Sequence, residues 1–390
     1  MPGKPLDLFI LDKTVPTQER TEHRSFIQIV INNKYTDGAG NLYRPATDYY
    51  GFFPKKEGGY NIRDFRNTEE AALDSIARHA SGTYFTDTYG IYNDDWHSIR
   101  HLIEAPSLVY GGLHQNDVTL LRKMKRHHKL IMMEFNTLSP PTSPTLRVQV
   151  ERLFGIRWTG WTGRYFESLD TLANAEIPEW LITNYMAQHN GEWPFSQSGI
   201  VFVHGDGRLG ILEHRTHLNT PVPVIETAAE YREEYDVSGS VPYPFWFDIV
   251  TTDSRNKVIS EYRLDLTALG KQVMQTNQLP EAFPAVIAHA PRSMWRQYFP
   301  RFSIWGYSPT IAHFPGDYTY YYFAGDFADN PVEPFLSRLY GIQRFRKFLY
   351  SSTNASDRRR FFWEYYYPLI NTVLESRYNL EQTATQSYGE

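Results

Sequence analysis

The chain has 390 residues, of which 41% are hydrophobic and 21% are charged. These shares are ordinary for a folded globular protein and exclude disorder as its main state. The 39 basic and 44 acidic residues give a net charge of −5, which argues against a general nucleic-acid-binding protein because such proteins carry a basic face. Cysteine is absent, which excludes disulfides, thiolate metal sites, iron–sulfur clusters and a cysteine nucleophile.

No stretch approaches the roughly 18 apolar residues of a membrane span, so we expect none in this chain. The first residues, MPGKPLDLFIL, lack the charged and apolar regions of a signal peptide. We therefore expect a cytoplasmic protein if the chain begins at Met1, and the sequence otherwise leaves the compartment and the oligomeric state open. Aromatic residues make up 16% of the chain. Such rings suit stacking on sugars and nucleobases, but they also fill cores.

Apolar runs alternate with helical patterns in the first part of the chain. Residues 22–33 fit a helix or a strand, and residues 35–59 are expected to form a long loop. Asn116 is expected to cap a helix, and Gly155 to end one. Strands are predicted at 6–11, 83–87 and 130–133, and helices at 71–80, 117–128 and 145–154. Strands that alternate with helices predict right-handed βαβ units and a mainly parallel sheet.

The pattern changes near residue 166. Two hairpins are predicted, 199–203 with 209–213 and 245–250 with 258–264, each around a polar turn. Helices at 178–189, 266–276, 336–349 and 358–374, and apolar runs at 285–288 and 318–323, complete the chain. We predict an α/β protein with a Rossmann-like domain over residues 1–165, built on a mainly parallel sheet flanked by helices. Residues 166–390 are predicted to form a more β-rich, mixed α+β region with hairpins and C-terminal helices.

Three familiar motifs are incomplete. Gly205–Gly210 has the spacing of a dinucleotide-binding fingerprint, but a strand pattern follows where a helix is needed, so we expect a hairpin turn and no cofactor. His97 and His101 lack the glutamate of a zinc-protease motif, and His214 and His217 form only a loose pair. We therefore expect no required metal. Neither a serine elbow nor a phosphate-binding loop is present.

Acidic residues stand at the ends of three predicted strands, namely Asp12, Asp87 and Glu134, and Asn136 follows the last of them. Ligands of open α/β sheets bind outside the carboxyl ends of the strands, so these residues are candidates for one polar site. The alternative is that each carboxylate only caps a loop or helix by accepting backbone N–H bonds.

Two further segments combine polar and aromatic groups. Residues 157–166 contain Trp158, Trp161 and Arg164 among glycines and threonines, and we expect a tight loop beside the pocket, although a packed, salt-bridged loop is an equal alternative. Asp326 and Asp329 follow a tyrosine-rich strand pattern and could serve acid–base chemistry or cap a buried turn.

The order of strands and helices up to residue 154, with the strand that ends at Glu134, resembles a Rossmann-like flavodoxin or class I glutamine amidotransferase-like domain. The resemblance covers about the first 160 residues and rests on pattern. That family uses a cysteine nucleophile with histidine and glutamate partners. Because this chain has no cysteine, the resemblance extends only to degenerate members that lack amidotransferase activity.

The candidate residues together favour an enzyme or sensor that acts on a small polar, carbohydrate-like ligand through carboxylates and aromatic platforms. Glu134 and Asp326 are the expected pair for general acid and base. Asp12, Asp87, Asn136, Trp158, Trp161, Arg164 and Asp329 are the expected ligand-binding residues. The alternative is a non-catalytic binding or assembly protein that retains an amidotransferase-like fold without its chemistry.

Overall fold

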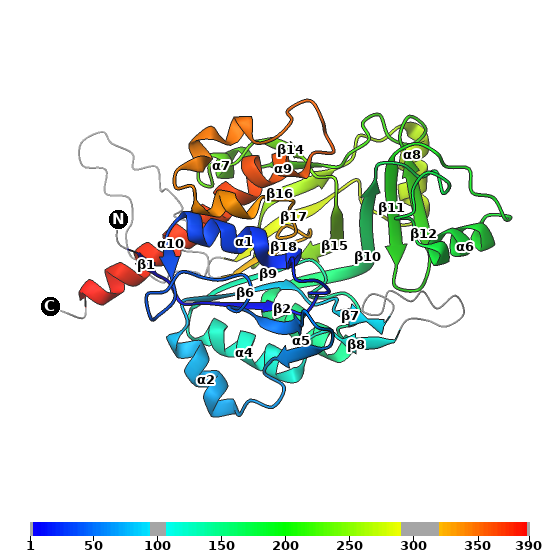
Figure 1. Cartoon of the computed structure of the whole chain (residues 1–390). Coiled ribbons are helices and arrows are strands. Elements are labelled where there is room, and N and C mark those ends of the chain that lie inside the picture. Colours follow the sequence, from blue (N-terminus) through cyan, green and yellow to red (C-terminus); the bar gives the residue numbers. More distant parts are fainter. Residues whose placement is uncertain (1–2, 94–106, 290–319, 388–390) are drawn as a thin grey trace.

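A computed structural model describes residues 3–93, 107–289 and 320–387, and two sheets dominate it (Figure 1). Within the described residues the larger sheet has ten strands. In spatial order these are β14 (Ser240–Pro242), β13 (Val224–Thr227), β16 (Lys257–Arg263), β17 (Ala282–His289), β18 (Tyr320–Phe323), β9 (Leu130–Glu134), β6 (Gly82–Asp87), β2 (Leu8–Asp12), β4 (Tyr50–Pro54) and β5 (Tyr60–Arg63). The smaller sheet contains β12 (Leu209–Glu213), β11 (Gly199–His204), β10 (Ile156–Phe166) and β15 (Trp246–Thr252). Two short pairs, β1 (Lys4–Pro5) with β3 (Tyr35–Thr36) and β7 (Ile91–Tyr92) with β8 (Leu108–Tyr110), lie apart from both.

Helices cover both faces of the parallel strands. On one side lie α2 (Glu70–His79), α4 (Gln115–Arg126) and α5 (Pro144–Phe154), and on the other lie α1 (Thr21–Asn32) and α10 (Tyr367–Ser387) (Figure 1). The remaining helices are α6 (Glu179–Gln188), α7 (Ala229–Arg232), α8 (Ala268–Thr276) and α9 (Arg358–Phe361), with 3-10 helices η3 (Pro334–Arg338) and η4 (Ile342–Phe348) and a π-helical turn η5 (Phe362–Tyr366). In the part of the chain that the structure describes, no helix is long and apolar enough to cross a bilayer.

The α/β class is confirmed, but the large sheet is mixed rather than mainly parallel. Parallel pairing joins β18, β9, β6, β2 and β4, whereas every other neighbouring pair in this sheet is antiparallel. Strands from both sides of residue 166 belong to this sheet, because β18 pairs directly with β9. The two sequence regions therefore share one sheet, and their division at residue 165 stays a prediction.

Several local predictions are confirmed and others are wrong. The strands that end at Asp12, Asp87 and Glu134 are present, and Gly155 ends α5 in the left-handed conformation with φ 72°. Residues 35–59 are not one loop, since they contain β3 and β4. Asn116 does not cap α4. His114 occupies the cap position, and the Asn116 amide donates to backbone oxygens of residues 65–68 instead.

The second predicted hairpin is also wrong, although both of its strands exist. β15 and β16 follow each other around a short turn but enter different sheets: β15 pairs with β10, and β16 pairs with β13 and β17. The turn is fixed by Asn256, whose amide donates to the carbonyl oxygens of Phe154 and Gly155. Those contacts align β15 with the start of β10, so β15 pairs with β10 and not with the adjacent strand β16.

The first predicted hairpin, β11 with β12, is confirmed. Residues 336–349 form 3-10 turns instead of the α-helix that was expected.

Much of the aromatic content is core. Tyr84, Tyr262, Tyr321 and Tyr322 are fully buried in the large sheet and its surroundings. Tyr84 and Tyr322 donate their hydroxyl protons to Glu134 and Asp248, as buried hydroxyls require. Composition alone therefore overstates the number of rings available to a ligand.

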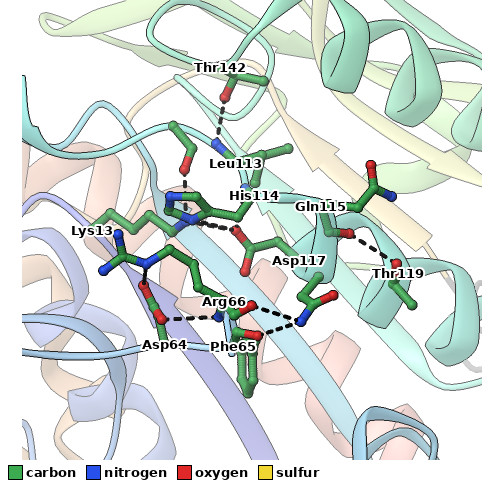
Figure 2. Close-up of polar contacts among 12 residues, drawn as sticks. Lys13, Asp64, Phe65, Arg66, Leu113, His114, Gln115, Asp117, Thr119 and Thr142 are labelled. Atoms are coloured by element: carbon green, nitrogen blue, oxygen red, sulfur yellow. Dashed lines mark hydrogen bonds and ion pairs between the residues drawn. The ribbon is translucent and has the colours of Figure 1, made fainter. Parts of the chain in front are cut away.

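A buried lysine ties the sheet to α4 (Figure 2). The Lys13 ammonium donates to the Gly112 carbonyl, to Nδ1 of His114 and to Oδ2 of Asp117, each at 2.7 Å. Burial lowers the pKa of Lys13, while the charge of Asp117 opposes that shift. Burial would raise the pKa of Asp117, but the charge of Lys13 and the hydrogen bonds from His114 and Lys13 hold it at about 2. The pair is therefore ionised at neutral pH.

Candidate functional site

A cavity of about 520 Å³ lies where the carboxyl ends of β6 and β9 meet the smaller sheet. We call it the acidic cavity, because four carboxylates reach it: Glu22, Asp87, Asp326 and Asp329. Aromatic side chains form much of the remaining wall, namely Tyr89, Phe135, Trp158, Phe166, Trp180, Phe245 and Trp246. The site thus combines acid–base groups with flat apolar surfaces.

Six of the nine residues expected from the sequence line the acidic cavity. These are Asp87, Asn136, Trp158, Arg164, Asp326 and Asp329. Asp12 and Glu134 are fully buried and are not part of the wall, and Trp161 packs elsewhere. Residues 157–166 form strand β10 rather than the expected loop, and alternate residues of a strand face opposite sides. Trp158 therefore faces the cavity, whereas Trp161 is 4% exposed and lies against His204 and Arg208.

Asp12 lies behind the cavity wall and shares a proton with His23. Its Oδ2 lies 2.5 Å from Nδ1 of His23, and Nε2 of the same ring donates to the Pro45 carbonyl at 2.9 Å. Burial raises the pKa of Asp12, with a further contribution from the charge of Asp329. Burial lowers the pKa of His23 to about 4. Burial therefore favours the uncharged form of each of these two side chains.

Asp87 is the acid whose pKa lies nearest to neutrality. Burial and the charge of Asp12 raise its pKa to about 7, although a 2.6 Å hydrogen bond from the Tyr89 N–H opposes that rise. Asn136 donates to Oδ1 of Asp87 at 3.4 Å and adopts the left-handed conformation, with φ 67°. This conformation is one that asparagine tolerates better than most residues. A carboxyl group with this pKa can both give and take a proton near pH 7.

Asp326 is placed by backbone contacts between the two sheets. Its N–H donates to the Trp246 carbonyl at 3.1 Å, and the Asp248 N–H donates to the Ala324 carbonyl at 2.9 Å. Burial raises the pKa of Asp326 well above its ordinary value, and the charges of Asp329 and Asp87 add to this effect. Asp329 forms an ion pair with Arg358 at 3.5 Å. The cavity therefore holds a carboxyl group with a raised pKa near a second carboxyl group that pairs with a cation.

Glu134 is fully buried next to the cavity wall and contacts the loop that carries Asp326 and Asp329. Its Oε2 accepts a 2.6 Å hydrogen bond from the Tyr84 hydroxyl, and its carboxylate faces the Ala328 N–H at 3.3 Å. Burial raises its pKa, and the charge of Asp326 raises it further. These contacts fix the loop that carries Asp326 and Asp329. The position favours a supporting role for Glu134, and its catalytic role stays a prediction.

Arg164 stands at the aromatic side of the cavity. Its guanidinium lies 4.4 Å from the ring centre of Phe166 and 4.9 Å from that of Trp246, and it pairs with Glu176 at 2.5 Å. Its Nε is buried without a hydrogen-bond partner. An acceptor group of a bound ligand would satisfy this donor.

Sequence reasoning missed Glu22, His204, Trp180 and Trp246. Glu22 lies in the first turn of α1, directly after the loop that leaves β2, and that position is a usable signal in an α/β fold. Its Oε2 is buried without a partner, and burial and the charge of Asp12 raise its pKa. Trp246 could not be found, because it reaches the cavity through the pairing of β15 with β10.

His214 and His217 do not line this cavity. His97 and His101 lie outside the described residues. His217 accepts a hydrogen bond from the Glu213 N–H through Nδ1, at 3.1 Å. Within residues 3–93, 107–289 and 320–387, no group of three or more acidic or histidine side chains is arranged to hold a metal ion.

Comparison with protein-family models, curated proteins and solved structures finds no match to this chain. The function must therefore be argued from the geometry of the acidic cavity.

Proposed function

We propose that the acidic cavity binds an oligosaccharide and hydrolyses a glycosidic bond by general acid–base catalysis. The observation that carries this proposal is the meeting of Asp87 and Asp326 with a wall of aromatic rings in one cavity of about 520 Å³. Sugar rings present apolar C–H faces that stack on aromatic side chains, and their hydroxyl groups hydrogen-bond to carboxylates.

Asp87 is the proposed proton donor to the leaving oxygen, because its pKa of about 7 leaves it largely protonated below neutral pH. Asp329, which pairs with Arg358, is the proposed general base: it takes a proton from the water that attacks the anomeric carbon, while the glycosidic bond breaks and Asp87 protonates the leaving oxygen. The charges of Asp329 and Asp87 both raise the pKa of Asp326. Two carboxyl groups in opposite protonation states are what glycoside hydrolysis requires.

The test uses a panel of hexasaccharides: cello-, xylo-, laminari-, malto- and chitohexaose. Calorimetry measures binding of each, and release of reducing ends measures hydrolysis. We expect at least one to bind and be cleaved. We expect Asp87→Asn and Asp329→Asn to retain binding but lose about 100- to 10,000-fold in turnover.

Absence of binding to every hexasaccharide would overturn the proposal. Binding without cleavage would favour the alternative, a non-catalytic binding protein that keeps the carboxylates for hydrogen bonding. Asn136→Ala serves as a second variant, since loss of its hydrogen bond to Asp87 should change the pH dependence of turnover more than substrate binding.

A further inference from the structure

A second cavity, of about 640 Å³, borders the outer side of α1. Arg20 precedes the helix, and Arg24, Gln28 and Ile31 follow at spacings of three or four residues, so these positions share one face. Glu22, which reaches the acidic cavity, lies on another face. We call the second space the arginine cavity, because Arg20, Arg24, Arg44 and Arg338 all line it.

The charges around the arginine cavity are strongly unbalanced. Its single acidic lining residue is Glu19, and Arg44 is occupied by an ion pair with Asp48 at 3.1 Å. Among the described residues, Arg20, Arg24 and Arg338 form no ion pair within 4.0 Å. Three guanidinium groups therefore surround one space in a chain whose net charge is −5.

Several buried polar atoms in this cavity lack partners, although the terminal nitrogens of Arg20 donate to the carbonyl and side-chain oxygens of Gln18. The Nε atoms of Arg20 and Arg24 and both amide atoms of Gln28 are buried without a hydrogen-bond partner. Arg20 is 9% exposed and Gln28 is 2% exposed. Native proteins satisfy almost all buried polar groups, so this set points to a ligand that supplies several acceptor oxygens.

We infer that the arginine cavity binds an organic phosphate or sulfate ester. Guanidinium groups match the oxygen geometry of such anions through paired N–H donors, and three of them suit a group with three free oxygens better than a carboxylate. Ile31, Leu42 and Tyr340 supply an apolar wall for the organic part.

The same headgroup chemistry occurs in a soluble ester and in a phospholipid. Next to Tyr340, the side chains of Phe335, Leu339 and Phe345 are 61%, 45% and 60% exposed, respectively. Asn32 of α1 holds this segment by donating to the carbonyl oxygens of Leu336 and Ser337. The experiment must therefore separate the two sources.

The test titrates the full chain with phenyl phosphate, phenyl sulfate and inorganic phosphate at constant ionic strength in chloride buffer. A second arm measures co-sedimentation with phosphatidylcholine vesicles with and without phosphatidic acid. We expect saturable binding to at least one soluble ester or to the phosphatidic acid vesicles. Arg24→Gln should raise the dissociation constant at least tenfold. Binding in the first arm assigns a soluble ester, and binding confined to the second assigns a lipid headgroup.

Arg338→Gln is the second variant, because its side chain is exposed and its replacement should leave folding intact. Arg122→Gln is the matched control, since Arg122 is an exposed arginine of α4 outside the cavity. The inference is overturned if neither arm detects binding, or if Arg24→Gln and Arg338→Gln both bind like the unchanged protein. Hexasaccharide binding is measured on the same variants and should not change, which separates this site from the acidic cavity.

Discussion

Asp12 and Lys13 are adjacent in the sequence, yet their side chains reach helices on opposite faces of the large sheet. Oδ2 of Asp12 meets His23 of α1 at 2.5 Å, and Nζ of Lys13 meets Asp117 of α4 at 2.7 Å. The alternation of side chains along β2 produces this arrangement. One strand end therefore positions the hydrogen-bonded Asp12–His23 pair on the α1 side of the sheet and the Lys13–Asp117 ion pair on the α4 side.

Removal of the Lys13 charge should destabilise the protein strongly. Lys13→Met leaves the Asp117 carboxylate buried without its cation, and breaking a buried pair in this way costs about 3–5 kcal/mol. Urea denaturation measures the free energy of unfolding. The double variant Lys13→Met/Asp117→Leu should recover much of the loss, and Lys55→Met, at an exposed lysine, is the control. A loss below about 1 kcal/mol would mean that the pair contributes little.

The buried acids should make the protein less stable as the pH rises. The folded state keeps a proton on Asp87 up to about pH 7, whereas the unfolded state loses it near pH 4. Between these values the folded state binds more protons, so the free energy of unfolding falls as the pH rises. For Asp87 alone the difference is about 4 kcal/mol as an upper limit.

Unfolding midpoints measured between pH 4.5 and pH 8 check this prediction. Asp87→Asn removes the titrating group, so its stability should depend less steeply on pH and should exceed that of the unchanged protein at pH 8. A profile that is flat, or that rises with pH, contradicts the assignment.

The local part of the fold was accessible from the sequence. β2, β6 and β9 are short apolar runs that end in acids, and parallel strands bring their carboxyl ends to one edge. Asp87 and Asn136, which follow two neighbouring strands, therefore lie together as expected. The position of these strand ends did not determine which side chains face the cavity, because Asp12 and Glu134 turn towards the buried partners His23 and Tyr84.

The rest of the candidate site could not be predicted, because it depends on pairing between strands that lie far apart in the sequence. β15 pairs with β10 and not with its sequence neighbour β16, and this pairing places Trp246 beside Arg164. Trp158 and Trp161 are three residues apart and would have been assigned to opposite faces had the segment been recognised as a strand. Its glycines and threonines suggested a loop instead.

A methyl group at Gly325 should disturb the loop that carries Asp326. A Cβ there would collide with the Tyr262 hydroxyl and would lie 2.7 Å from the Tyr243 hydroxyl and 2.6 Å from a ring carbon of Phe327. We expect Gly325→Ala to cost about 1–3 kcal/mol, the usual effect of overpacking a core. Thermal unfolding measures the loss. Gly38→Ala is the control, since its nearest neighbouring atom would lie 3.9 Å away, and equal stability of the two variants would contradict the prediction.

Turnover of a cleaved oligosaccharide should decline above neutral pH. If Asp87 is the proton donor, its protonated fraction falls about tenfold for each pH unit above its pKa of about 7. The rate of the unchanged protein should follow this decline, and the residual rate of Asp87→Asn should not. The measurement is kcat at saturating substrate between pH 5 and pH 9. An unchanged alkaline limb in Asp87→Asn would assign the proton donor to another residue.

Trp180 should contribute to ligand affinity without contributing to stability. It extends from α6 over the acidic cavity and is 52% exposed, so a sugar ring can stack on it while few core contacts depend on it. Aromatic stacking is typically worth about 0.5–1.5 kcal/mol beyond burial, so Trp180→Ala should weaken oligosaccharide binding about two- to twelvefold. Calorimetric titration gives the dissociation constant, and thermal unfolding verifies that the midpoint is unchanged. Leu172→Ala is the matched control, because Leu172 is 97% exposed and lies outside the cavity wall. Equal affinities in the two variants would remove Trp180 from the binding surface.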